Sequence, residues 1–98
     1  MRPTDEILAE RGQNYGDFGT GSRLEAAMIE LIANNHMKQN NKAMSTEQII
    51  WFSKIIMKLS RLSVTPNHLD SWTDIAGYAR LVEIELNNKK EAENAQGQ

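Results

Sequence analysis

The clearest pattern of apolar and polar positions lies in the stretch from Ser45 to Leu62. Ser45, with Gln48 three residues later, has the spacing of a capping box and predicts that a helix begins here. On a helix that turns about 100° per residue, the apolar positions of this stretch form one wide arc. Its members are Phe52, Ile55, Ile56, Leu59 and Leu62. Pro66 disfavours a helical Thr65, which predicts the end of the helix before that residue.

The same helix carries three cations, Lys54, Lys58 and Arg61, together on one flank. Ile50 and Met57 lie beyond them, so a second apolar strip borders the basic row. A helix with apolar residues on two sides is expected to be buried on two sides, within its own bundle and against another subunit. The cations could extend to water, pair with acids of the same chain, or converge on an anionic ligand.

A second helix is predicted from the capping box formed by Ser22 and Glu25, and its pattern fades near Asn35. Its apolar stripe consists of Leu24, Ala27, Met28, Leu31 and Ile32. The glycine-rich segment from Gly12 to Gly21 before it is expected to be a loop.

A third helix is expected after the turn at Pro66, with Asp70 or Ser71 as its cap. Gly77 lies inside this helix at a cost of about 1 kcal/mol relative to alanine, which suggests a close approach of another helix or a ligand. Its apolar stripe consists of Ile75, Ala79, Val82 and Leu86.

The expected fold is all-α, because no segment alternates apolar and polar residues with period two. We expect a small bundle of three main helices and a short N-terminal helix capped by Thr4. Oligomerisation would complete it as a four-helix or larger bundle. Residues 1–88 would form a single domain, and the polar residues 89–98 would be a frayed or disordered tail.

The composition excludes several classes of protein and several kinds of site. The chain has 98 residues, 40% of them hydrophobic and 24% charged, as expected for one globular domain. A formal net charge of −2 argues against general nucleic-acid binding, and the lack of cysteine excludes disulfides and thiolate metal sites. No apolar run approaches the roughly 20 residues of a membrane span, and the N-terminus lacks a signal-peptide pattern, so we expect a cytoplasmic protein.

An acidic group could supply a metal site. Asp70 and Asp74 are four residues apart on one helix face, near the position from which Glu85 projects. Paired carboxylates of this kind can hold magnesium together with phosphate oxygens. The alternative is that both aspartates stabilise the positive end of their helix.

Several segments together resemble a family of small phage and prophage proteins of uncharacterised function. These segments are Glu10-Arg11-Gly12, Tyr15-Gly16-Asp17-Phe18, Lys58-Leu59-Ser60-Arg61-Leu62 and the run from Asn67 to Ala79. The closing segment is also distantly similar to the last helix of MazG-type nucleotide pyrophosphohydrolases and of phage nucleotide-modification-associated domains. This resemblance implies an all-α, oligomeric fold that handles nucleotides.

The chain departs from the MazG-type pattern where those enzymes bind magnesium. Their Glu-Glu-x-x-Glu helix motif is absent, and their later Glu-x-x-Asp motif is reduced to Ser71 and Asp74. Lys54 and Lys58 occupy the helix that would carry the first motif. Exchanging anions for cations favours direct binding of phosphate over metal-dependent hydrolysis.

The leading hypothesis is therefore a phage-encoded helical protein that binds a nucleotide, a cyclic nucleotide or a related signal without catalysis and without a required cofactor. Such a protein could act against host defence by sequestering the signal. The candidate ligand-binding residues are Arg11, Tyr15, Trp51, Lys54, Lys58, Arg61, Asp70, Asp74 and Tyr78. One alternative is a magnesium-dependent nucleoside triphosphate pyrophosphohydrolase with Asp70, Asp74 and Glu85 as metal ligands. Another is a structural protein–protein interaction module.

Overall fold

The computed structural model describes residues 17–96 and Thr4, and the part from residue 17 onward is helical throughout apart from two short connections. It contains α2 (Phe18–Asn40), α3 (Thr46–Val64) and α4 (Leu69–Gln96), with no strand in this part of the chain. The prediction of an all-α fold with three main helices is confirmed. The short N-terminal helix predicted after Thr4 falls outside the described residues.

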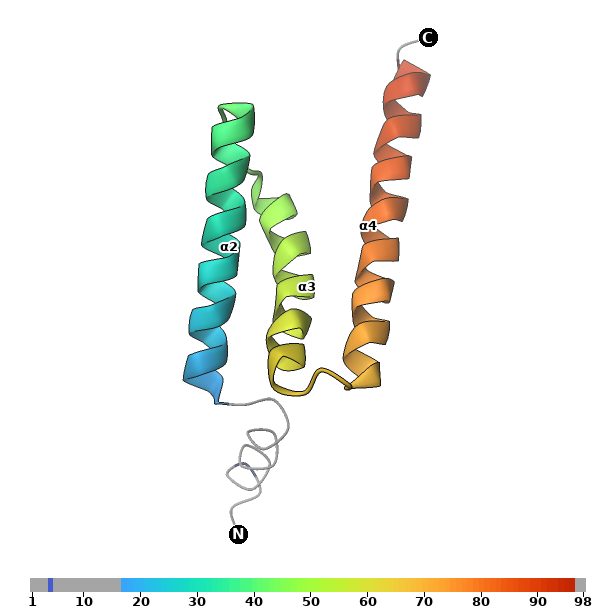
Figure 1. Ribbon diagram of the computed structural model, residues 1–98. Helices are drawn as coiled ribbons and strands as arrows, with labels where there is room; N and C mark the ends of the chain where they lie inside the picture. The colour runs from blue at the N-terminus through green and yellow to red at the C-terminus, as the bar shows by residue number, and fades with distance from the viewer. Residues whose placement is uncertain (1–3, 5–16, 97–98) are drawn as a thin grey trace.

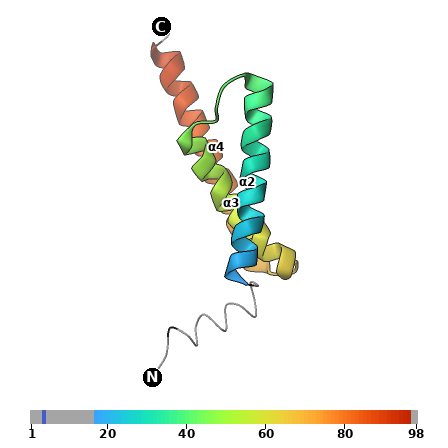
Figure 2. The ribbon, with the colours of Figure 1, turned by 90° about the vertical axis from the view of Figure 1, so that its left-hand side faces the viewer.

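The three helices run up, down and up in a single layer, with α3 in the middle (Figure 1). α3 packs against both α2 and α4. Seen after a 90° turn, α2 and α4 diverge toward the end of the layer where α4 ends (Figure 2). The layer therefore has two broad faces on which all three helices are accessible.

α2 begins earlier than the sequence pattern suggests. The Asp17 carboxylate accepts a hydrogen bond from the backbone N–H of Thr20 at 2.9 Å and caps the helix, so the predicted start at Ser22 is wrong. Gly21 is consequently helical and lies against α3, where the Ser60 hydroxyl donates to its carbonyl at 3.5 Å. The helix also continues past Asn35 to Asn40.

The end of α2 is set by Asn41, which adopts the left-handed conformation with φ 56°. Its backbone N–H donates to the carbonyl of Met37 at 2.8 Å, a common way to close a helix. The polar residues just before Asn41, which lie beyond the predicted fading of the helix near Asn35, belong to the last turn of α2.

The predicted capping box of α3 is confirmed. The Ser45 hydroxyl accepts from the Gln48 backbone N–H, and the Gln48 side chain accepts from the Ser45 backbone N–H, both at 3.1 Å. The helix ends at Val64, before Pro66, as expected.

α4 begins at Leu69, so Asp70 and Ser71 lie in its first turn and do not cap it. Ser71 is almost fully buried, and its hydroxyl lies 2.8 Å from Nδ1 of His68. The indole N–H of Trp72 donates to the Pro66 carbonyl at 2.9 Å and ties the turn to the helix. α4 then continues to Gln96 through the segment expected to fray.

The interior of the layer is small. Ile56 and Leu62 are the only large hydrophobic residues that are buried among the described residues, and of these two only Ile56 is fully buried. Both belong to α3, consistent with its central position. None of the described helices has both the length and the hydrophobicity that crossing a membrane requires.

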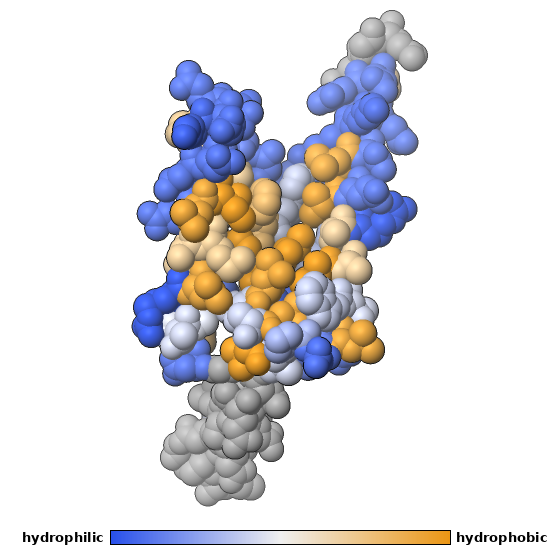
Figure 3. Space-filling view, in the orientation of Figure 1, coloured by the Kyte–Doolittle hydropathy of each residue, from blue (hydrophilic) through white to orange (hydrophobic). Residues whose placement is uncertain are grey.

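Much of the predicted apolar surface is exposed on one side of the layer, which we call the front face. Helical periodicity places two large apolar residues from each helix there: Leu24 and Leu31, Phe52 and Leu59, and Trp72 and Leu86. In the space-filling view, hydrophobic atoms extend across all three helices on this side, whereas the far ends of α2 and α4 are polar (Figure 3). The opposite side, the back face, carries the charged residues of α3.

Candidate ligand groove between α3 and α4

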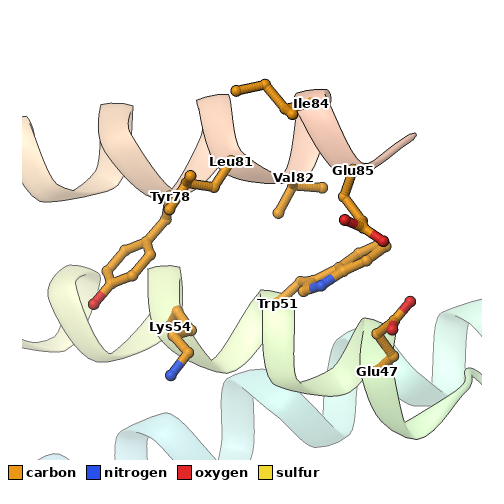
Figure 4. Close-up of a pocket in the computed structure, with 8 residues that line it drawn as sticks. All are labelled: Glu47, Trp51, Lys54, Tyr78, Leu81, Val82, Ile84 and Glu85. Carbon is orange, nitrogen blue, oxygen red and sulfur yellow. The ribbon is translucent and has the colours of Figure 1, made fainter. Parts of the chain in front are cut away.

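A groove of about 500 Å³ runs between α3 and α4. Its volume falls within the range of roughly 300–1,000 Å³ that is usual for small-molecule sites. Both helices contribute to its walls, as the close-up in Figure 4 shows. The lining residues are Glu47, Trp51, Lys54, Tyr78, Leu81, Val82, Ile84 and Glu85.

Helical spacing explains why these residues share one groove. Glu47, Trp51 and Lys54 are separated by four and three residues along α3, so they lie on one strip of that helix. Tyr78, Val82 and Glu85 repeat the same spacing along α4. The groove is therefore formed where these two strips face each other.

The two ends of the groove differ in character. Tyr78 and Lys54 lie at one end, Glu47 and Glu85 at the other, and the Trp51 indole lies between them (Figure 4). The Lys54 ammonium group points away from α4 in this view, so its nitrogen is at the rim of the groove. A cation and a phenol thus mark one end, and two carboxylates mark the other.

Lys89 covers part of the acidic end. Its Nζ lies 5.3 Å from the centre of the Trp51 ring and 2.5 Å from Oε1 of Glu47. The hydrogen bond to Glu47 raises the pKa of Lys89 above its ordinary value of 10.5. Lys89 belongs to the segment that was expected to be a frayed tail. Because it is four residues after Glu85, it lies on the groove strip once α4 is extended to include it.

Lys58 does not line the groove. It is buried, and its Nζ lies 2.9 Å from a carboxylate oxygen of Asp74, which is about half exposed. Three alternatives were left open for the basic row: extension into water, pairing with acids of the same chain, and contact with an anionic ligand. For Lys58 the structure shows the second, pairing within the chain. The pair joins α3 to α4 one turn away from Lys54 and Tyr78.

The other predicted site residues are dispersed. Arg61 is partly buried in the last turn of α3, and Asp70 is exposed in the first turn of α4, but neither lines the groove. Arg11 and Tyr15 lie outside the described residues. Within residues 17–96, no three carboxylate or histidine groups are placed to hold a metal ion, so Asp70, Asp74 and Glu85 are not brought together as a metal centre.

Comparison with protein families gives one match, a model of a domain of unknown function that covers residues 2–85. The chain belongs to this family, DUF6378. The matched range includes every residue that lines the groove of this DUF6378 domain, and it stops before Lys89. No curated protein and no solved structure matches the chain.

Proposed function

We propose that this DUF6378 domain binds a phosphate-bearing nucleotide or a nucleotide-derived signalling molecule in the groove between α3 and α4. One observation carries the proposal. Trp51, Lys54 and Tyr78 come from two different helices, and each was a candidate ligand residue on sequence grounds; all three line the same groove.

The polarity of the groove matches that of a nucleotide. The flexible Lys54 side chain can turn inward and meet phosphate at one end, where Tyr78 supplies a hydroxyl. A base would stack on Trp51, and Glu85 at the other end would accept hydrogen bonds from its amino group. Because Lys89 lies over the Trp51 ring, the base would either displace this side chain or stack on the opposite side of the indole.

The ion pair between Lys58 and Asp74 has a supporting role in this proposal. It fixes the spacing of α3 and α4 beside the groove, and neither group needs to touch the ligand. Arg61 and Asp70 would act only if a long ligand extended beyond the groove. Arg11 and Tyr15, which lie outside the described residues, stay candidates for a phosphate clamp and a base-stacking residue.

The ligand would be held without being converted, since the distant resemblance to MazG-type enzymes implies that Lys54 and Lys58 lie on the helix that carries metal-binding glutamates in those enzymes. As part of the same proposal, a phage-encoded protein of this kind would sequester a nucleotide signal used in host defence. This extension is supported by the resemblance of the motifs to small phage proteins.

Isothermal titration of the full chain with nucleoside triphosphates, cyclic mononucleotides and cyclic dinucleotides tests the proposal. At least one of them should bind, and Lys54→Gln should weaken that binding about tenfold or more, since a charged hydrogen bond contributes about 1.5–3 kcal/mol. Lys38→Gln, on α2 and away from the groove, is the matched control and should bind as the unmodified chain does. Absence of binding across the panel, or equal affinity of both variants, would contradict the proposal.

The second candidate function is a protein–protein interaction module. The observation that favours it is the exposure of the front face, on which Leu31 is 70% and Trp72 50% exposed. The two functions use different surfaces and can coexist.

A further inference from the structure

We infer that the front face is covered by a second copy of this chain, so that two helical layers stack face to face around a shared core. The inference deepens the interaction-module candidate and is independent of ligand binding in the groove, which opens on the back face. It rests on the extent of the front face, the placement of charge around it and the size of the core within one layer.

The exposed apolar area is large for such a small protein. Leu24, Leu31, Phe52, Trp72 and Leu86 are between 38% and 70% exposed. Together with Leu59 they present on the order of 500 Å² of apolar surface, if a large side chain offers roughly 150–250 Å². A patch of this size lies in the upper part of the range of about 300–600 Å² found for the largest apolar patch on a monomer, which is often functional. It would supply more than half of the roughly 800 Å² that each partner buries in a stable interface, and the polar residues around it would supply the rest.

The charges of α3 are kept away from this face. All four charged residues of the helix, Glu47, Lys54, Lys58 and Arg61, lie within one narrow arc of its surface. That arc is turned toward α4 and the back face, whereas Phe52 and Leu59 lie on the front. Covering the front face therefore removes no charge of the central helix from water, and the desolvation cost is low.

The small interior indicates that the cover is permanent. Because Ile56 and Leu62 are the only buried large hydrophobic residues in the described part, one layer has little apolar burial to offset the entropy cost of folding. A transient partner would leave the chain poorly folded between encounters. A second copy is present whenever the chain is made. Its own front face offers an apolar surface of the same size.

The shape of the surface also favours a copy of the chain. The front face is a broad layer three helices wide, and a single helix or an extended peptide would cover only one of its grooves. A second layer, related by a two-fold axis, would cover the whole face with residues that are complementary by symmetry. The polar ends of α2 and α4 would remain in water (Figure 3).

Light scattering coupled to size-exclusion chromatography, run on the unmodified full chain at several micromolar, tests the inference directly. The expected mass is twice the 11.1 kDa of one chain, or an even multiple built from such pairs. The midpoint of thermal unfolding should also rise with protein concentration, because folding and association are coupled. A folded monomer with a concentration-independent midpoint, an odd-numbered assembly, or a stoichiometric complex with a different protein would overturn it.

A matched pair of variants locates the interface. Leu31→Asp introduces a charge on the front face, and Ile50→Asp introduces the same charge on the back face, at a side chain that is 49% exposed. We expect Leu31→Asp to give monomers or unfolded chain, and Ile50→Asp to keep the mass of the unmodified protein. Unchanged assembly of Leu31→Asp, or loss of assembly in Ile50→Asp alone, would place the interface elsewhere and refute the inference.

The mass measurement also separates this inference from the ligand proposal. A dimer that binds no nucleotide would retain the interface and remove the groove function. A monomer that binds nucleotide through Lys54 would do the reverse.

Discussion

The front and back faces of the helical layer contain similar apolar residues but differ in where charge is placed. On the front face, Phe52 and Leu59 of α3 are flanked by apolar residues of α2 and α4. On the back face, Ile50 and Met57 stand next to the basic row, and the groove on that side has a lysine at one end and glutamates at the other. Both faces expose hydrophobic side chains, but on the front face none of the charged residues of α3 lies among them.

In our proposals, this difference corresponds to two kinds of binding. A uniformly apolar surface gains most from a flat apolar partner, since burial is favourable and no charge has to be desolvated. A groove with separated charges instead selects a small molecule that is itself polar at its ends. The exposed fractions of apolar residues alone would not have distinguished a surface for an apolar partner from a groove for a small polar molecule.

The largest expected effects on the free energy of unfolding come from truncating apolar side chains. One such side chain is chosen in the interior, one on the front face and one on the back face. Ile56→Ala, at a site only 1% exposed, should lower the free energy of unfolding by about 2–5 kcal/mol. If a second layer covers the front face, Phe52→Ala should cost a similar amount, about 3–5 kcal/mol. Ile50→Ala on the back face should cost clearly less. Urea denaturation measures all three, and a Phe52→Ala cost as small as that of Ile50→Ala would break the comparison.

A smaller effect is expected at the ion pair beside the groove. Asp74→Ala leaves the buried Lys58 ammonium group without its partner and should cost about 1–2 kcal/mol, a value reduced because Asp74 is half exposed. Lys58→Met should cost less, since Asp74 can then be solvated. The control is Asp70→Ala, which removes an exposed carboxylate one helical turn before Asp74. If thermal denaturation shows Lys58→Met to be the more damaging change, the lysine would have a partner other than Asp74.

The sequence predicted those features of the fold that depend on neighbouring residues. The capping box of Ser45 and Gln48 fixed the start of α3, because both hydrogen bonds are local. The start of α2 was missed because Asp17 and Ser22 are both acceptable caps by residue type. In the folded chain the Asp17 carboxylate accepts from Thr20, and Gly21 packs against Ser60. The full length of α4 was missed for a similar reason, since Lys89 meets Glu47 and Trp51 from a distant part of the chain.

The candidate site, like the fold, could be predicted from the sequence only in part. Trp51, Lys54 and Tyr78 were selected from residue type and helical spacing, and they line one groove. Whether Lys58 faced a ligand or Asp74 depended on the relative position of α3 and α4, which the pattern of a single helix does not determine.

Gly77→Ala should have a modest stabilising effect. The sequence suggested that this glycine permits a close approach, but a Cβ atom at position 77 would meet nothing within 4 Å inside one chain. Alanine should therefore raise the free energy of unfolding by about 0.5–1 kcal/mol through its better helix propensity. If alanine instead weakens assembly or nucleotide binding, position 77 contacts a partner, and the back face would also be an interface.

The smallest effect concerns Lys89 and the access to Trp51. Because the pKa of Lys89 is raised in the folded protein, its stabilising contribution is complete below pH 10.5 and is lost as the pH rises through the higher folded value. Single-tryptophan protein carrying Trp72→Phe should show a change in Trp51 emission over that alkaline range. Lys89→Met should abolish this transition while barely changing the unfolding midpoint, since an exposed ion pair contributes little. A transition that persists in Lys89→Met would not come from Lys89, and this lysine would then have no measurable effect on the environment of Trp51.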